Sequence, residues 1–203
     1  MSLRRLAQHQ PESFAFSAEN AAWVAGQIKK YPPGRQASAV IPVLWRAQEQ
    51  DGWVTKPMIE EVARILGMAY IRVLEVATFY TMFNLHPVGE HLVQVCTTTP
   101  CWLRGSDDVV AACKKHILPH AEAVSEDGKF SWMEVECLGA CVNAPMILID
   151  KDPYEDLDGA KTGELIEAIR RGEQPKTGSQ IGRHTSEPIG GATTLKEQSD
   201  ARG

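Results

Sequence analysis

The sequence predicts an α+β protein, in which a helical bundle over residues 1–88 precedes a sheet-containing domain over residues 89–172. Three observations carry this prediction. Apolar residues recur at helical spacing through the first 85 or so residues, between helix-stop signals. Alternating, β-prone segments begin only after His86-Pro87-Val88-Gly89. From 173 to 203 glycine and proline dominate, which predicts an extended tail without a core of its own.

Four helices are expected in the first domain. Ser17 and Thr55 are suited to cap the first and third, because a short side-chain oxygen can accept the free N–H groups of a first turn. Gly52 and Gly67 are suited to end the second and third. No helix carries evident catalytic groups, so a bundle that packs its apolar faces together is the simplest interpretation. The expected helices cover about residues 18–31, 38–50, 56–66 and 71–83.

The second domain is expected to follow the order β-α-β-β-α, with a further strand near Val124 as an option. Ser106 followed by two aspartates suits the start of a helix, and two lysines and His116 suit its end. A strand, a crossover helix and further strands describe a two-layer domain. The tail is expected to be either flexible or held by a partner. The expected strands cover about residues 91–96, 130–136 and 146–149, and the expected helices 106–116 and 162–171.

Composition limits the classes of function. The chain has 203 residues, of which 43% are hydrophobic and 23% charged, as in ordinary soluble globular proteins. A net charge of −5 disfavours nucleic acid as a partner, and no run approaches the roughly 20 apolar residues of a spanning helix. The N-terminus lacks the apolar core of a secretory signal. Arg4 and Arg5 are compatible with a mitochondrial presequence, but their segment is short and soon turns acidic, so an imported protein is the less favoured alternative. We therefore expect a cytoplasmic-side protein.

Four of the five cysteines fall in two close pairs, Cys96-Thr97-Thr98-Thr99-Pro100-Cys101 and Cys137-Leu138-Gly139-Ala140-Cys141. Each pair follows an expected strand, so both pairs are expected at the same end of a small sheet. Four thiolates suit an iron–sulfur cluster or zinc. Without a secretory signal, a disulfide framework is disfavoured.

The spacing favours a binuclear iron–sulfur cluster and leaves zinc as the main rival. A thioredoxin-type dithiol needs Cys-x-x-Cys, which is absent, and the plant-type ferredoxin spacing also fails. No dinucleotide-binding glycine fingerprint appears, so we expect NADH and flavin to bind elsewhere than on this chain. His91, His116 and His120 have no partner that spacing supplies, and such histidines are usually surface or capping residues.

The fifth cysteine and the residues that flank the paired cysteines have either structural roles or roles toward a metal centre. Cys113 lies on the apolar face of the expected helix, where a free cysteine is most simply a small buried hydrophobe. Gly139 and Ala140 are small enough to let backbone approach an inorganic core. The hydroxyls of Thr97, Thr98 and Thr99 either donate to cluster sulfurs or only stabilise a turn.

Three strings make a resemblance specific: Phe79-Tyr80-Thr81-Met82-Phe83, Val95-Cys96-Thr97-Thr98-Thr99-Pro100-Cys101, and Val135-Glu136-Cys137-Leu138-Gly139-Ala140-Cys141-Val142-Asn143-Ala144-Pro145. With them the chain resembles the small iron–sulfur subunit of the NADH-oxidising module of respiratory complex I, NADH:quinone oxidoreductase. This is the bacterial E subunit, or 24-kDa subunit. The resemblance runs from about Phe14 to Gly190-Gly191, and the helical half alone would not carry it.

The resemblance implies a helical bundle followed by a thioredoxin-like ferredoxin domain that holds one 2Fe-2S cluster, each cysteine pair binding one iron. It implies a cis proline, for which Pro145 is the candidate. Carried over residue by residue, the implied ligands are Cys96, Cys101, Cys137 and Cys141.

The resemblance also implies a partner, the larger flavoprotein subunit that binds FMN, NADH and a 4Fe-4S cluster, together with other peripheral-arm subunits. The chain alone would be an electron carrier without a substrate site, exchanging electrons with that flavin as an accessory centre. The assembly would place it on the inner face of the bacterial inner membrane. Similar subunits serve the diaphorase modules of soluble NAD-linked hydrogenases and formate dehydrogenases, and that assembly stays an alternative.

Overall fold

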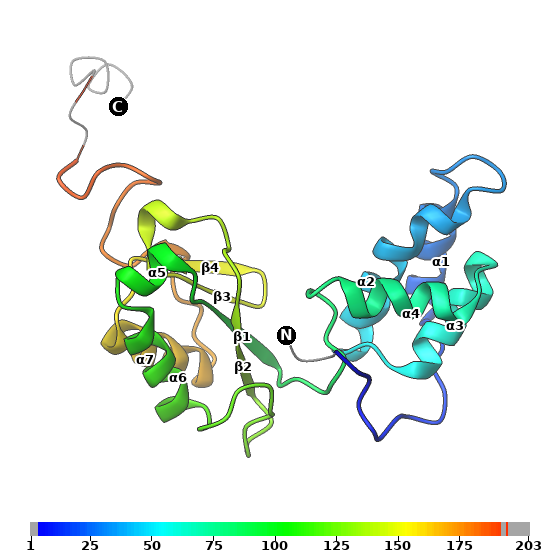
Figure 1. The fold of residues 1–203 in the computed structure, drawn as a ribbon, viewed down its shortest axis with the longest axis horizontal. Coiled ribbons are helices and arrows are strands. Elements are labelled where there is room, and N and C mark those ends of the chain that lie inside the picture. Colours follow the sequence, from blue (N-terminus) through cyan, green and yellow to red (C-terminus); the bar gives the residue numbers. More distant parts are fainter. Residues whose placement is uncertain (1–3, 192–193, 195–203) are drawn as a thin grey trace. The chain divides into compact units, whose positions relative to one another are not determined.

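The computed structural model describes residues 4–191 and residue 194. The chain forms two compact units, one that ends at Val88 and one that begins at Gly89 (Figure 1). Among the described residues, no helix is both long enough and apolar enough to cross a membrane. The expected order of a helical part followed by a mixed helix-and-sheet part is confirmed.

The first unit is helical throughout. Ser17 and Thr55 cap α1 and α3 as expected, each accepting a backbone N–H from the residue three positions later. Gly52 and Gly67 end α2 and α3 in the left-handed conformation, which glycine adopts without a steric penalty. The helices are α1 (Ala18–Ile28), the 3-10 helix η1 (Gln36–Ala39), α2 (Val40–Asp51), α3 (Lys56–Leu66) and α4 (Tyr70–Phe79).

The helices of the first unit enclose one apolar core. Val43 and Leu44 of α2 and Ile59 and Val62 of α3 are completely buried in it. Gln48 is a polar side chain buried beside them: its amide N–H donates to the carbonyl of Met82 at 3.0 Å and its amide oxygen accepts the N–H of residue 84 at 2.7 Å. The chain that follows α4 is therefore tied to α2.

The helix α4 is shorter than the sequence predicts: it ends at Phe79, whereas a helix to Phe83 was expected. Phe83 is completely buried, so the chain leaves the helix to bring this ring into the core. The guanidinium of Arg4 donates to the carbonyl oxygens of Tyr80 at 2.7 Å and Thr78 at 3.2 Å. It thereby satisfies carbonyls that the end of a helix leaves without intrahelical partners.

The second unit is a five-stranded mixed sheet in the order β2-β1-β3-β4-β5, covered by two helices that lie side by side (Figure 1). Strands β1 and β2 are parallel, β3 is antiparallel to both β1 and β4, and β5 is parallel to β4. The elements are β1 (His91–Cys96), α5 (Thr99–Leu103), α6 (Ser106–His116), β2 (Phe130–Val135), the 3-10 turn η2 (Cys141–Asn143), β3 (Ile147–Ile149), β4 (Asp152–Glu155), α7 (Gly159–Arg170) and β5 (Gly178–Ser179).

The core of the second unit lies between the sheet and the helices α6 and α7. Phe130 and Trp132 of β2 are its largest buried side chains, and the indole N–H of Trp132 donates to the carbonyl of Leu118 at 2.9 Å. Cys113 of α6 is completely buried among them, which confirms its expected place in the core.

Several elements differ from the sequence predictions. The short strands β4 and β5 and the helix α5 were not predicted, and α6 is capped by Gly105 in the left-handed region rather than by Ser106. No strand forms at Val124, although the neighbouring Ser125 N–H bonds to the carbonyl of Phe130 at 2.8 Å. β4 and β5 have too few residues to show an alternating pattern, and only pairing with β3 and with each other makes them strands.

The described part of the tail is held by its own chain, which was neither of the expected options. β5 pairs with β4, and the guanidinium of Arg183 forms an ion pair with the carboxylate of Asp156. Both side chains are almost completely buried, 5% and 3% exposed. Of the predicted tail, residues 192–193 and 195–203 lie outside the described residues.

Candidate metal centre

The structure brings both cysteine pairs to the same end of the sheet. Strands β1 and β2 are parallel with Cys96 opposite Val135, so their carboxyl ends meet. Cys96 is the last residue of β1, and Cys137 follows β2 by two residues. Cys101 lies in α5 and Cys141 begins η2.

The first pair is buried. The thiols of Cys96 and Cys101 belong to residues that are each 1% exposed. Burial raises the pKa of Cys96, but hydrogen bonds from the Thr98 hydroxyl, from backbone groups and from Cys101 outweigh burial and leave that pKa below its ordinary value. The Thr98 Oγ1 lies 3.3 Å from the Cys96 sulfur. Burial and the hydrogen bond to Cys96 raise the pKa of Cys101 to about 12.

The second pair is exposed, and its sulfurs lie 3.4 Å apart as free thiols. The backbone N–H of Gly139 points at the Cys137 sulfur at 3.4 Å. Gly139 has φ of +92°, in the region that favours glycine, so the close approach depends on this residue type. The hydrogen bond with Cys137 is the main cause that raises the pKa of Cys141.

The loop that carries Cys137 and Cys141 contacts the loop that carries Cys96 and Cys101. The backbone of Leu138, the residue after Cys137, helps to lower the pKa of the Cys96 thiol. The charge of Cys96 also raises the pKa of Cys141. The side chain of Leu138 packs on the small apolar cluster that contains the first pair. One electrostatic environment therefore includes all four sulfurs.

The donor set fits a 2Fe-2S cluster. Four sulfurs are available, two on a buried side and two on an exposed side, with N–H and O–H donors already directed at two of them. Among the described residues no three histidine, cysteine or acidic side chains are already arranged around one metal position. The exposed pair instead makes a thiol hydrogen bond between Cys137 and Cys141. A bound cation would reverse the rise in thiol pKa, because it favours the deprotonated sulfur.

Thr98 and Gly139 are the flanking residues whose contacts the structure resolves most clearly. The Thr98 hydroxyl contacts a sulfur, and α5 takes no hydrogen bond from this side chain as a cap. The alternative that the threonines only stabilise a turn therefore does not describe Thr98. The peptide bond before Pro145 is cis, as the resemblance implied.

Other candidate groups have local partners. His91 Nδ1 lies 2.7 Å from a carboxylate oxygen of Asp150, and His116 Nδ1 lies 3.0 Å from one of Glu167. Cys113 differs from both pairs in its environment: burial alone raises the pKa of its thiol to about 12. Cys113 has the core position that the sequence suggested, whereas His91 and His116 have carboxylate partners that their spacing in the sequence did not indicate.

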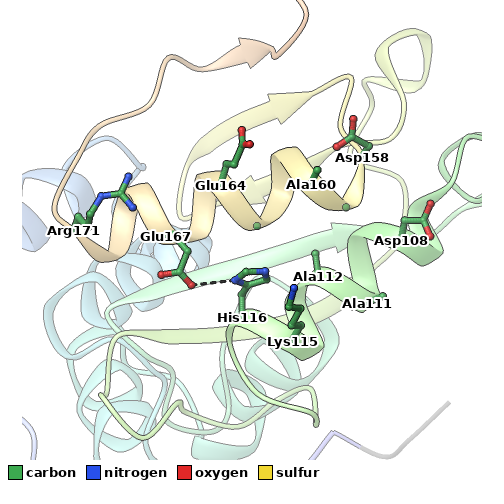
Figure 2. A pocket seen from close by; sticks show the side chains of 12 residues that line it. Asp108, Ala111, Ala112, Lys115, His116, Asp158, Ala160, Glu164, Glu167 and Arg171 are labelled. Carbon is green, nitrogen blue, oxygen red and sulfur yellow. Dashed lines mark hydrogen bonds and ion pairs between the residues drawn. The ribbon is translucent and has the colours of Figure 1, made fainter.

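A hollow of about 820 Å³ is lined by residues of α6 and α7 (Figure 2). Two of these residues, His116 of α6 and Glu167 of α7, are hydrogen-bonded to each other. Its rim carries acidic and basic side chains, Asp108, Lys115 and Arg171 among them, and none of the paired cysteines lines it. The hollow therefore contributes nothing to a centre built on the four thiols.

The sequence missed two features of the site. One is α5, whose signal was present: Pro100 lies in the first turn after Thr98, where proline is tolerated because an N–H there has no intrahelical partner. The other is the contact between the tail and the turn that carries Cys141, where Arg183 Nη2 donates to the carbonyl of Val142 at 3.3 Å. No local signal predicts that contact, because the two residues are 41 positions apart.

Comparison with known proteins gives a consistent family. A family model described as thioredoxin-like 2Fe-2S ferredoxin matches residues 24–170. The NADH-quinone oxidoreductase E 1 subunit of Rhizobium meliloti (strain 1021) is 59% identical over 201 residues, which cover 97% of this chain and 73% of that relative. The NADH-quinone oxidoreductase E subunit of Rickettsia bellii (strain RML369-C) is 53% identical over 159 residues, 78% of this chain and 95% of that relative.

Among solved structures, an NAD+-reducing NiFe-hydrogenase in the H2-reduced state covers 68% of this chain and 23% of its own, with a TM-score of 0.57 and 19% identity. At that identity the likeness concerns the fold alone. The expected fold, helices followed by a thioredoxin-like ferredoxin domain, is confirmed by the family match.

Proposed function

Because the chain belongs to the thioredoxin-like 2Fe-2S ferredoxin family, among the E subunits of NADH-quinone oxidoreductase, we propose that it is an electron-transfer subunit with one 2Fe-2S cluster. When bound, such a cluster takes up and releases one electron at a time. The proposed ligands are Cys96, Cys101, Cys137 and Cys141.

One observation carries the ligand assignment: the carboxyl ends of the parallel strands β1 and β2 meet, and the side chain of Leu138, beside Cys137, packs on the apolar cluster that contains Cys96 and Cys101. A disulfide or a dithiol needs only two cysteines, whereas a four-thiolate centre needs both pairs at one end of the sheet. Hydrogen bonds to ligand sulfur also stabilise negative charge, which an added electron increases.

The two pairs have different roles in this proposal. Cys96 and Cys101 hold the centre on the buried side, where Met146 and Ala144 exclude water. Cys137 and Cys141 hold it on the exposed side, which faces any redox partner. Thr98 and Gly139 direct an O–H and an N–H at sulfur and so set the electrostatic environment of the centre.

The test is the metal content and spectrum of the full chain purified without oxygen. We expect two irons and two acid-labile sulfides per chain and, after reduction, the rhombic electron spin resonance signal of a binuclear cluster. About one zinc and no labile sulfide would contradict the proposal and favour a structural zinc module, which is colourless.

Two matched variants test the ligands. Cys137→Ser should lose or distort the cluster spectrum, because serine oxygen is a harder donor than thiolate. Cys113→Ser should leave that spectrum nearly intact, since Cys113 lies in the core of α6. A spectrum that is insensitive to Cys137→Ser would refute the assignment.

We further propose that the chain works beside a larger flavoprotein subunit that binds FMN and NADH, and that its cluster exchanges electrons with that flavin as an accessory centre. The identity to two NADH-quinone oxidoreductase E subunits favours this assembly over a hydrogenase or formate dehydrogenase diaphorase. Peripheral-arm subunits and attachment to the inner face of the bacterial membrane are part of the same proposal. Copurification of a stable pair from coexpressed genes would support it, and a chain that never binds the flavoprotein would contradict it.

A further inference from the structure

We propose that Arg183 is a positioning residue for the metal centre, acting through a tail strap, residues 178–187, that holds the turn carrying Cys141. The inference rests on the proposed function, because it assigns Arg183 a role toward the cluster ligated by Cys141. The strap follows the last helix of the second unit and returns to the cysteine end of the sheet.

The turn that carries Cys141 needs an external support. Cys96 lies on a strand and Cys101 in a helix, and both are buried. Cys141 begins the three-residue turn η2, whose own backbone bonds are Asn143 N–H to Ala140 at 2.9 Å and Ala144 N–H to Cys141 at 3.4 Å. A single turn of this kind is marginal without packing or hydrogen bonds from outside.

Arg183 supplies such bonds from one buried guanidinium. Its side chain is 5% exposed and forms an ion pair with Asp156, whose side chain is 3% exposed. The Nε of Arg183 donates to Asp156 Oδ2 at 3.1 Å, and Nη2 donates to the carbonyl of Val142 at 3.3 Å. Val142 follows Cys141 directly. The planar fork of arginine can serve a carboxylate and a carbonyl at once, which lysine cannot do with a fixed geometry.

A second link runs through Asn143, which is 2% exposed. Its side-chain amide donates to the carbonyl of Thr185 in the strap at 2.8 Å and to Glu155 of β4 at 2.6 Å. From the sheet side, the Asp156 N–H donates to the Asn143 carbonyl at 2.7 Å. The turn η2 is thus held by the strap on one side and by the sheet on the other. Asp156 contributes to both, through its ion pair with Arg183 and through its N–H.

The strap itself is fastened to β4. The Ser179 hydroxyl donates to Asp156 Oδ2 at 2.6 Å, and the Gln180 N–H donates to the carbonyl of Glu155 at 3.0 Å. Arg183 Nη1 also donates to the carbonyl of Glu187 at 3.1 Å, which closes the strap on itself. Removing the guanidinium would leave the buried Asp156 carboxylate without its counter-ion and free the Val142 carbonyl.

The test compares Arg183→Ala and Arg183→Lys with the control Arg171→Ala in the full chain. Arg171 also pairs with an acidic neighbour, Glu173 at 2.6 Å, but its side chain is exposed and the pair lies outside the strap. The first measurement is amide hydrogen exchange of the metal-free chain at Asn143 and Ala144. The second is visible circular dichroism, with the g values of the reduced cluster, in the reconstituted chain.

In Arg183→Ala we expect the amides of Asn143 and Ala144 to exchange about 10- to 100-fold faster, because the variant loses the free energy of one hydrogen bond that involves a charged group. The amides of β1 should keep their exchange rates. The dichroism and g values should change, and iron should be lost to a chelator faster. Arg183→Lys should be intermediate, since it keeps the charge and loses the fork. Arg171→Ala should match the wild type in every measurement.

Unchanged exchange at both amides in Arg183→Ala would overturn the inference. Faster exchange with wild-type dichroism and g values would also overturn it, because the strap would then be structural only. If Arg183→Ala does not fold, Arg183→Lys decides by the same two criteria. A wild-type chain without a 2Fe-2S cluster would contradict the proposed function instead, and the exchange data would still report on the strap.

Discussion

Replacing Thr98 by valine should lower the reduction potential of the proposed cluster, because the change removes one hydrogen bond to the sulfur of Cys96, a proposed ligand, and little else. The Thr98 hydroxyl lies 3.3 Å from the Cys96 sulfur. Valine has nearly the same shape as threonine but no donor. The hydroxyl makes no cap bond to α5, so the variant should leave that helix in place.

The size of the shift follows from the strength of such a bond. A hydrogen bond to a charged acceptor contributes about 1.5–3 kcal/mol. The sulfur is negative in both oxidation states, so only the increase on reduction counts, and we take this part as on the order of 0.5–1 kcal/mol, below the full energy of the bond. For a one-electron couple, in which a tenfold change corresponds to about 59 mV, this is a shift of about 20–40 mV. The bond favours the more negative state, so its loss makes the potential more negative.

A redox titration followed by electron spin resonance measures the potential in the full chain. Thr98→Ser keeps the hydroxyl and should stay close to the wild type. Thr97→Val is the matched control, because the described part of the chain shows no hydrogen bond from the Thr97 hydroxyl to sulfur. A Thr98→Val potential equal to the wild type, or an equal shift in Thr98→Ser, would refute the reasoning.

Two further predictions concern stability, measured by urea unfolding. Gly89→Ala should cost about 1–3 kcal/mol, because its Cβ would lie 2.5 Å from the backbone carbon of Phe130; Gly26→Ala, with open space around it, should not destabilise the chain. Asp158→Ala should cost about 0.5–2 kcal/mol near pH 7, since Asp158 caps α7. Hydrogen bonds from Lys161 lower the pKa of Asp158, so this stabilisation is present above the ordinary carboxyl pKa, about 4, and is lost as pH falls through the lowered value. Asp158→Asn still provides a cap and should lose less free energy of unfolding than Asp158→Ala. If Asp158→Ala remained equally destabilising at pH 2, the expected pH dependence would be wrong.

Local signals in the sequence were sufficient for most elements. The strand β1 was predicted with the bounds it has, and Ser17, Thr55 and Gly67 begin and end their helices as expected. These predictions succeeded because a cap, a stop or an alternation depends on residues within a few positions of one another. The α4 helix shows the limit of such signals: burial of Phe83 and hydrogen bonds from Arg4 end it early.

For the candidate site, too, some features follow from the sequence and others only from the tertiary structure. The sequence by itself determined the four thiols, their grouping in pairs and the family that the strings around them resemble. Only the tertiary structure decided that the first pair is buried and the second exposed, and that the side chain of Leu138 packs on the cluster that contains the first pair. It also decided that Arg183 reaches the turn that carries Cys141. The physical reason is that these features arise from contacts between residues far apart in the chain, and their hydrogen bonds depend on how the sheet aligns its strand ends.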